Sequence, residues 1–252
     1  MIKIIMNGCN GKMGRVISRL AGEDANCEIV CGVDINTSVE NKYPVYKSIN
    51  DFSGEADVII DFSHPSTLTA TLEYAMSRNV PAIICTTGLS AEQKAEITAA
   101  SKKTAIFFSA NMSIGVNLIV ELAKKAAKVL EGNFDIEIIE KHHNQKIDAP
   151  SGTALMIADS VSDVLSGETV YTYDRHSVRK KRSSNEIGIH SVRGGSIVGE
   201  HSVIFAGQDE VVEIKHQATS KEVFAAGAVK AAKFIKGKPA GMYDMYDLIS
   251  IM

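Results

Sequence analysis

Cysteine is scarce in this sequence, and its spacing argues against two kinds of site. The four cysteines are Cys9, Cys27, Cys31 and Cys85, and no two of them form a C-x-x-C pair. No set of histidines and cysteines has the spacing of a zinc site either. We therefore expect no structural metal, and a protein whose thiols stay reduced, as they do in the cytoplasm.

An excess of one charge and long apolar segments are also absent. The formal net charge is −3, whereas a nucleic-acid-binding chain carries a basic stripe. A short basic run, RKKR at 179–182, is interpreted as a solvated loop. No apolar run approaches the roughly 20 residues of a membrane span, and the first residues lack the pattern of a signal peptide. We expect neither a nucleic acid nor a membrane as a partner.

The first half of the chain alternates short apolar runs with helical patterns. The predicted strands occupy 2–6, 27–34, 56–63, 81–88 and 104–111. Such alternation is typical of a parallel sheet that helices cover on both faces. The sequence therefore predicts an α/β fold with a Rossmann-type, dinucleotide-binding domain over residues 1–111.

The pattern changes after that point. A helix is followed by a predicted strand at 134–143, a second helix, a polar tract at 166–186 and further strands. Gly194-Gly195 is typical of a hairpin turn between two of these later strands. We expect a separate α+β domain over 112–218, with a mixed or antiparallel sheet.

The last part of the chain begins with a helix start signal. TSKE at 219–222 has the pattern of a capping box and precedes a helical run. We expect the helix and tail, residues 219–252, to return to the first domain.

Three glycines directly follow the first predicted strand. Gly8, Gly11 and Gly14 form G-x-x-G-x-x-G, a variant of the dinucleotide fingerprint in which Asn10 replaces the second glycine. Glycines permit close backbone approach, and a helix N-terminus offers N–H groups to a pyrophosphate. Asp34 follows at the end of the second strand, where a carboxylate would accept hydrogen bonds from ribose hydroxyls. The alternative is a glycine-rich turn that binds nothing.

Two further strand ends carry small polar groups, CTTG at 85–88 and SANM at 109–112. They would lie at the carboxyl edge of the same sheet, where open α/β sheets bind ligands. Taken alone, each motif could equally be ordinary loop and helix-cap chemistry. The complete predicted cofactor site consists of Gly8, Cys9, Asn10, Gly11, Lys12, Met13, Asp34, Cys85, Thr86, Thr87, Ser109, Ala110, Asn111 and Met112.

The residues next to Asp34 favour NADH over NADPH as the cofactor. Position 35 is Ile35, where a 2′-phosphate would favour an arginine, and the carboxylate of Asp34 would repel that phosphate. Lys12 could still attract a phosphate, so the preference is slight and both cofactors stay open.

A dense polar block, EKHHNQKIDAPSGTA, occupies 140–154. Its lysine, Lys146, offers a positive charge, and the start of a helix at Gly152 and Thr153 offers N–H donors, so the block suits an anionic substrate. A histidine such as His142 titrates in the range needed for proton transfer. Ser151 fits a helix N-cap. The alternative for the histidine pair is one core residue and one exposed residue.

These motifs together resemble the 4-hydroxy-tetrahydrodipicolinate reductase family, also called dihydrodipicolinate reductases. The resemblance rests on NGCNGKMG at the start, DFSHP at 61–65, TTG at 86–88, SANMSIGVN at 109–117, the block at 140–154, and VGEHSVIFAG at 198–207. They occur in the family's order over nearly the whole chain, and the block at 140–154 is the distinctive one.

The resemblance implies a fold, a reaction and an assembly. It implies a Rossmann domain and a mixed-sheet domain that builds a homotetramer. The implied reaction is reduction of the small dicarboxylate 4-hydroxy-tetrahydrodipicolinate by NADH or NADPH, with loss of water, in lysine and diaminopimelate biosynthesis. It assigns His142 as general acid/base and Lys146 as proton donor. His143, Lys146, Gly152 and Thr153 would contact the substrate.

Some positions depart from the family or stay unassigned. Lys12 and His64 stand where arginine is common, and Cys85 stands where glycine is frequent, which leaves the choice between NADH and NADPH open. Asp148 is interpreted as structural, and the role of Arg193 is undecided. The remaining strand histidines are interpreted as structural: His190, His201 and His216.

Two other functions compete with the reductase. One is a different two-domain Rossmann oxidoreductase that acts on an amino acid or semialdehyde, and the other is a non-enzymatic dinucleotide sensor. Because the cofactor edge and the substrate block fall in different predicted domains, we expect hinges near 111–113 and 216–220 to bring them together.

Overall fold

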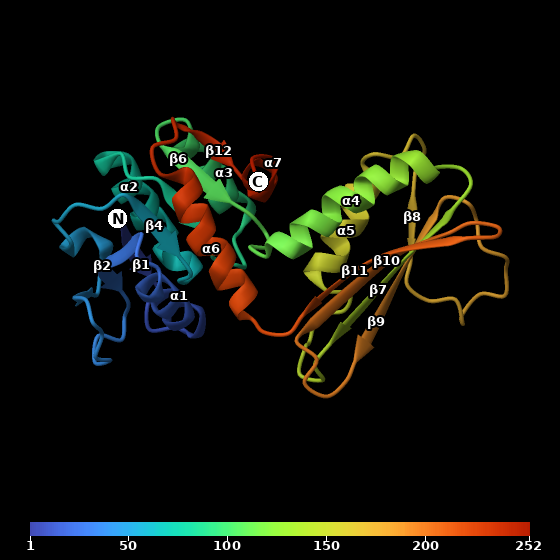
Figure 1. Ribbon diagram of the computed structural model, residues 1–252, viewed down its shortest axis with the longest axis horizontal. Helices are drawn as coiled ribbons and strands as arrows, with labels where there is room; N and C mark the ends of the chain where they lie inside the picture. Colours follow the sequence, from blue (N-terminus) through green and yellow to red (C-terminus); the bar gives the residue numbers. More distant parts are fainter. The chain divides into compact units, whose positions relative to one another are not determined.

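The computed structural model describes residues 1–252 as two compact units (Figure 1). The first unit comprises Met1–Ile114 and Glu222–Met252, and the second comprises Gly115–Lys221. The chain thus leaves the first unit and comes back to it near its end, and each unit has its own hydrophobic core.

The first unit is built on a parallel sheet. Its strands run in the order β12-β6-β5-β4-β1-β2-β3, and every neighbouring pair is parallel. The bounds of the strands are β1 Ile2–Asn7, β2 Cys27–Val33, β3 Val45–Tyr46, β4 Val58–Asp61, β5 Ala82–Ile84, β6 Ala105–Phe108 and β12 Gly241–Tyr243. The helices are α1 Lys12–Glu23, α2 Leu68–Arg78, α3 Ala91–Ser101, α6 Glu222–Ile235 and α7 Met245–Ser250, with short 3₁₀ turns at Ile49–Asp51 and Pro65–Thr67.

Helices cover both faces of this sheet. Successive residues of one strand point to opposite faces, and Ile4 and Ile5 are both fully buried. Ile4 packs into a core with α1, α6 and α7, whereas Ile5 packs into a second core with α2 and α3. The apolar runs therefore form strands buried on both sides, and the predicted Rossmann-type fold is confirmed.

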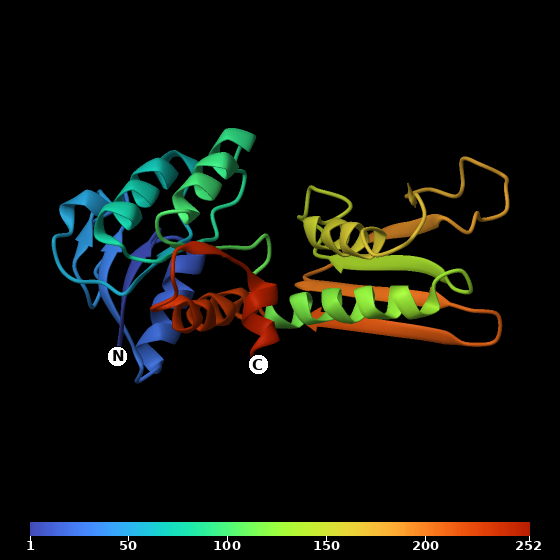
Figure 2. The same cartoon turned by 90° about the horizontal axis from the view of Figure 1, so that it is seen from above.

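The second unit carries a mixed sheet with helices on one face (Figure 2). Its strand order is β11-β10-β7-β9-β8, in which β7, β9 and β8 are parallel and β10 is antiparallel to both β7 and β11. The elements are α4 Ile114–Leu130, β7 Asp135–His142, α5 Gly152–Ser162, β8 Val170–Thr172, β9 Glu186–Arg193, β10 Gly199–Ala206 and β11 Val211–Ala218. Ile136 and Ile138 of β7 face α4 and α5. The mixed sheet is also confirmed.

The predicted hairpin at Gly194-Gly195 is wrong. Strands β9 and β10 are consecutive in the chain, but β7 lies between them and pairs with both. The loop containing the two glycines turns back across the end of β7 instead, since Gly194 N–H donates to His142 O at 2.9 Å and Asn144 N–H donates to Gly195 O at 3.2 Å. Local turn residues indicated the bend, but not the strand inserted between its two arms.

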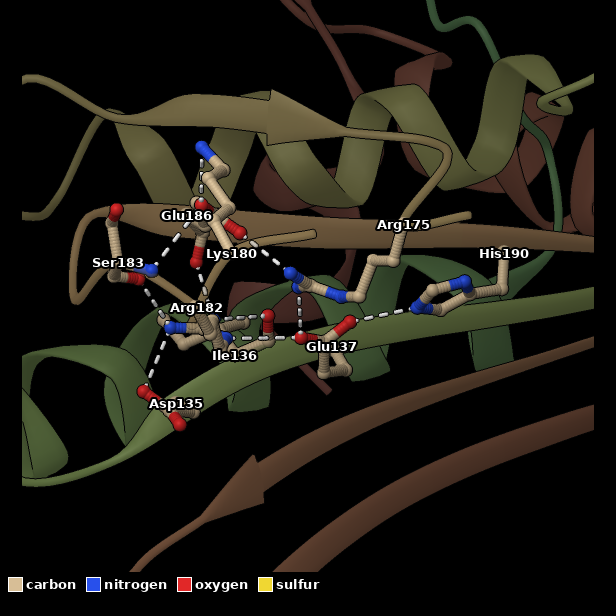
Figure 3. A network of polar contacts seen from close by, with 9 residues as sticks. All are labelled: Asp135, Ile136, Glu137, Arg175, Lys180, Arg182, Ser183, Glu186 and His190. Carbon is tan, nitrogen blue, oxygen red and sulfur yellow. Dashed lines mark hydrogen bonds and ion pairs between the residues drawn. The ribbon is translucent and has the colours of Figure 1, made fainter. Parts of the chain in front are cut away.

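The interpretation of 179–182 as a solvated loop fails at Arg182. The side chain of Arg182 is only 17% exposed and pairs with Asp135 at 2.7 Å and Glu137 at 3.0 Å. It also donates to the backbone oxygens of Ile136 and Glu186, where β7 and β9 begin. Figure 3 shows these contacts. The polar tract therefore includes β8 and a loop that arginines fix to the sheet.

Candidate active site

The glycine turn between β1 and α1 is closely packed. Gly8 has φ +80°, and a Cβ there would lie 2.5 Å from Phe62 O. A Cβ on Gly14 would lie 2.1 Å from Gly8 O. Only glycine fits these two positions without a backbone shift, and the turn leads directly into α1 at Lys12. The turn therefore has the shape that a dinucleotide-binding loop requires.

Asp34 directly follows β2 and lies against this turn. Its Oδ2 accepts from the Asn10 backbone N–H at 3.0 Å, and its Oδ1 accepts from the Asn36 N–H at 2.9 Å. The side chain of Asn10 donates to Asn36 O and accepts from Asn41 Nδ2. The structure thus brings the predicted ribose acid and the glycine turn together.

The other predicted cofactor residues gather around one pocket of about 230 Å³ in the first unit. It is lined by Phe62 and Phe224 together with seven predicted residues, namely Met13, Cys85, Thr87, Ser109, Ala110, Asn111 and Met112. A larger hollow of about 660 Å³ along α1 and β2 contains none of the predicted site residues. The carboxyl edge of the sheet therefore holds an apolar-walled pocket with hydroxyl and amide groups, which suits a nicotinamide ring.

Three side chains of the first unit do not line this pocket. The side chain of Cys9 is fully buried in the core, so only its backbone belongs to the turn. Thr86 is buried beside Asp61, and burial raises the pKa of that carboxyl. His64 caps the turn at Pro65–Thr67, because its ring accepts from Ser66 N–H at 3.2 Å. The glycine cradle and the pocket fit a nicotinamide dinucleotide without these three side chains.

In the second unit, the polar block begins at the end of β7. Glu140 and His142 are two residues apart on a strand, so both side chains point to the helix-covered face. Glu140 is fully buried, and its Oε2 accepts from His142 Nδ1 at 2.6 Å. The same carboxylate accepts two hydrogen bonds from Arg193 of β9, at 2.6 and 2.7 Å.

The start of α5 is fixed to the same carboxylate. Ser151 donates its backbone N–H to Glu140 Oε1 at 3.1 Å, and its Oγ accepts from Ala154 N–H at 3.1 Å. The predicted N-cap role of Ser151 is confirmed. His201 of β10, which is 4% exposed, contacts Ser151 Oγ through Nε2 at 3.0 Å, and its ring lies edge-on to that of His142.

Glu140 and His142 differ in their charge state at neutral pH. The hydrogen bonds from Arg193 and His142 outweigh burial and lower the pKa of Glu140 to about 2. Burial lowers the pKa of His142, the Glu140 carboxylate raises it, and Lys146 and Arg193 lower it, with a net decrease. The cluster therefore combines an ionised carboxylate with an imidazole that is neutral at neutral pH.

Lys146 lies in the loop between β7 and α5. Its side chain is 20% exposed, and its Nζ pairs with Asp148 Oδ1 at 2.8 Å, which lowers the pKa of that carboxyl. Arg193 also donates to the backbone oxygen of Asp148 at 2.7 Å. Asp148, interpreted as structural from the sequence, thus connects Lys146 with the cluster around Glu140.

The remaining predicted substrate residues flank this cluster. His143 is half-buried, and its backbone oxygen accepts from Lys146 N–H at 3.1 Å. Gly152 is exposed and begins α5, followed by the half-buried Thr153. The structure therefore brings His142, His143, Lys146 and the start of α5 together within the second unit.

Sequence reasoning missed Glu140, which holds His142, and left Arg193 undecided, although Arg193 holds Glu140. The spacing of two between Glu140 and His142 in a predicted strand already placed both on one face. Arg193 had no such signal, because its proximity depends on the parallel pairing of β7 with β9, where it is the register partner of His142.

This combination defines a class of protein. A Rossmann-type unit with a fitted dinucleotide cradle, and a second unit with a carboxylate-held histidine beside a lysine, are the parts of a two-domain oxidoreductase. No group of His, Cys, Asp or Glu in the chain could hold a metal ion, and no helix is long and apolar enough to cross a membrane.

Comparison with known proteins identifies the family. Residues 2–112 match the family model "Dihydrodipicolinate reductase, N-terminus", and residues 115–249 match "Dihydrodipicolinate reductase, C-terminus". The chain therefore belongs to the dihydrodipicolinate reductase family.

Individual relatives agree with this assignment. The 4-hydroxy-tetrahydrodipicolinate reductase of Caldanaerobacter subterraneus subsp. tengcongensis is 54% identical over 249 residues, which cover 99% of this chain and 98% of that protein. The one from Clostridium tetani is 52% identical over 97% of this chain and 96% of that protein. A solved structure, dipicolinate-bound dihydrodipicolinate reductase from Paenisporosarcina sp. TG-14, is similar with a TM-score of 0.83 at 25% identity, covering 100% of both chains.

Proposed function

We propose that this chain reduces 4-hydroxy-tetrahydrodipicolinate to tetrahydrodipicolinate with loss of water, a step of lysine and diaminopimelate biosynthesis. Family membership over both units supports the reaction. The observation that carries the chemistry is the placement of His142 at the end of β7, held by a buried carboxylate and accompanied by Lys146 and the start of α5.

The reaction exchanges a hydroxyl group for hydrogen, so it takes up a hydride and a proton and releases water. The bound nicotinamide supplies the hydride. The Lys146 ammonium donates the balancing proton and offsets negative charge that develops on the substrate. His142, neutral at neutral pH, can accept a proton at Nε2 and return it.

The substrate carries two carboxylates, and the second unit offers several groups to bind them. Lys146 supplies a positive charge and His143 a ring N–H. Gly152 and Thr153 lie in the first turn of α5, where backbone N–H groups point out of the helix and its dipole favours an anion. We assign these four residues to substrate binding.

For the cofactor, we assign the pyrophosphate to the turn at Gly8–Met13 and the ribose hydroxyls to Asp34. The pocket lined by Thr87, Ser109 and Asn111 suits the nicotinamide. Asp34 already accepts hydrogen bonds from the turn, and Ile35 beside it is 87% exposed and carries no charge for a 2′-phosphate. These features favour NADH slightly over NADPH.

We further propose that the chain acts as a homotetramer in the cytoplasm. One face of the mixed sheet packs on α4 and α5, while the opposite face has no helix and carries Ile139, Val192 and Ile204 among charged residues. Pairing these faces between copies would remove apolar area from water. All four cysteines are free thiols, as suits a reducing compartment. Light scattering of the purified protein tests the assembly.

The experiment that tests the function is a coupled assay. Substrate made enzymatically is offered with NADH and NADPH in parallel, and amino-acid and semialdehyde substrates are offered for comparison. We expect oxidation of both cofactors with 4-hydroxy-tetrahydrodipicolinate only, and the higher kcat/KM with NADH. Absence of turnover with this substrate would overturn the proposal.

A matched pair of lysine variants tests the proton donor. Lys146→Ala is expected to lower kcat by about 10²- to 10⁴-fold, the usual contribution of general acid catalysis, with NADH binding unchanged. Lys141→Ala is the control, because Lys141 is on β7 as well but pairs with Glu200 on the opposite face. Equal turnover in the two variants would contradict the role of Lys146.

A further inference from the structure

The side chain of Glu140 accepts four hydrogen bonds, which come from three residues. It is fully buried and accepts from His142 Nδ1, from both terminal nitrogens of Arg193 and from the Ser151 backbone N–H, all within 3.1 Å. An ionised carboxylate only accepts hydrogen bonds, so the proton of a neutral His142 must be on Nδ1. The other ring nitrogen, Nε2, is then left as the basic one.

The surroundings of Nε2 keep it accessible. No protein group hydrogen-bonds to Nε2, and it is not among the buried polar atoms without a partner. Gly199 of β10 lies close to this nitrogen, because a Cβ on Gly199 would lie 3.1 Å from Nε2. The edge-on ring of His201 supports the imidazole, with ring centres 5.2 Å apart. The ring is thus held by one nitrogen and open at the other.

We propose that Glu140 and Arg193 are positioning residues of the reductase reaction, which fix the imidazole of His142 so that Nε2 faces the substrate. This inference rests on the proposed function. Arg193 keeps the carboxylate oriented through two parallel hydrogen bonds, and the same guanidinium holds the loop of Lys146 through the backbone oxygen of Asp148. One arginine therefore aligns both proton-transfer groups.

The charged groups around His142 determine how its pH response changes when Glu140 is altered. They are Glu140 on β7, Lys146 and Asp148 in the following loop, Arg193 on β9 and His201 on β10. Among them, Glu140 raises the pKa of His142, whereas Lys146 and Arg193 lower it. Removing the charge of Glu140 thus lowers the pKa of His142 further, and the pH below which the imidazole becomes protonated falls.

The test compares Glu140→Gln with Glu137→Gln. Both replace an arginine-paired carboxylate of β7 by its amide, but Glu137 is on the opposite face and does not contact His142. We expect Glu140→Gln to lower kcat about 10- to 100-fold, as loss of a supporting hydrogen bond typically does. The acidic limb of its kcat–pH profile should move to a pH about one unit lower, which is the typical size of a pKa shift in a folded protein. The control should keep the wild-type profile.

A purely structural role would reduce the amount of folded protein without moving that limb. An unshifted limb in a folded Glu140→Gln variant would therefore overturn the proposal. If this variant does not fold, Arg193→Lys keeps the charge but loses the paired geometry. We then expect kcat to fall about 10-fold with KM nearly constant, and wild-type kcat in Arg193→Lys would equally overturn it.

A second readout separates this inference from the proposed function. In ¹⁵N spectra of histidine-labelled protein, His142 of the wild type should show the neutral form with the proton on Nδ1, and Glu140→Gln should lose that form. These spectra need no substrate. If the wild type shows the expected tautomer but no turnover, the function is wrong and the geometry stands; the opposite tautomer would refute the positioning role itself.

Discussion

Two carboxylates of one strand, Glu137 and Glu140, illustrate how the same contacts can serve different purposes. Each accepts from arginine and from a histidine: Glu137 from Arg175, Arg182 and His190 (Figure 3), and Glu140 from Arg193 and His142. Because they are an odd number of residues apart, they point to opposite faces of the sheet.

The difference lies in burial and in which groups surround the bound histidine. Glu140 is fully buried beneath the start of α5, while the side chain of Glu137 is 21% exposed and its arginines come from the loop between β8 and β9. The contacts of Glu137 fasten that loop to the sheet. Those of Glu140 hold a histidine in a cluster with His201, Lys146 and the start of α5. We conclude that similar ion pairs indicate function only where they hold a reactive group among other site residues.

The largest expected effect is on the free energy of unfolding, which Glu140→Ala should lower more than Glu137→Ala. Glu140→Ala leaves the guanidinium of Arg193 without its partner next to a buried cavity, and breaking such a pair costs about 3–5 kcal/mol. Glu137→Ala should cost roughly 1 kcal/mol, nearer the value of partly exposed ion pairs. Urea unfolding of both variants at equal protein concentration measures this. Equal losses would remove the distinction drawn from burial.

Adding one methyl group beside His142 should lower activity while the protein stays folded. In Gly199→Ala the new Cβ would lie 3.1 Å from His142 Nε2, so the imidazole shifts. Because small displacements of a catalytic group are costly, kcat should fall about 10- to 100-fold. Steady-state assays and circular dichroism check this together. A folded Gly199→Ala with wild-type kcat would show that Nε2 does not need that space.

The corresponding change beside Glu137 should affect only the loop. A Cβ on Gly188 would lie 1.7 Å from Glu137 Oε2, so in Gly188→Ala the carboxylate must leave Arg175, Arg182 and His190. We expect faster hydrogen exchange over 173–185, by about 10-fold for each 1.4 kcal/mol by which the loop is destabilised, with kcat within twofold of wild type. Unchanged exchange would mean that other interactions hold the loop.

The smallest effect should appear on acidification. Arginine and histidine partners lower the pKa of both carboxyls, that of Glu140 to about 2. A folded pKa below the unfolded value of about 4.3 stabilises the fold above that pH and loses this contribution as the pH falls through the folded value. The Glu140 carboxylate should therefore stay ionised toward pH 2 while overall stability decreases. A side-chain carboxyl ¹³C signal of Glu140 that titrates near pH 4 would contradict its depressed pKa.

Much of this could be predicted from the sequence, and the exceptions share a physical cause. The parallel sheet, the glycine turn and the N-cap at Ser151 depend on neighbouring residues, so periodicity and turn chemistry predict them. The position of β7 between β9 and β10 depends on strands distant in the chain. The hairpin at Gly194-Gly195 was therefore predicted wrongly.

The candidate site shows the same division. The block at 140–154 is contiguous, and its histidines, lysine and helix start could be recognised together. Arg193 and His201 reach it only through pairing with β7, so their proximity could not be inferred. Arg182, in the basic run, finds its carboxylates on β7, 45 residues or more away in the chain, and no local pattern distinguishes it from its solvated neighbours.

The most direct test of the central claim is the rate of 4-hydroxy-tetrahydrodipicolinate reduction by His142→Gln and His190→Gln, measured side by side with NADH. Both changes remove a histidine bonded to a β7 glutamate. We predict that His142→Gln loses about 10²- to 10⁴-fold in kcat while binding NADH normally, and that His190→Gln turns over at the wild-type rate. Wild-type turnover by His142→Gln, or an equal loss in both variants, would contradict the catalytic role of His142.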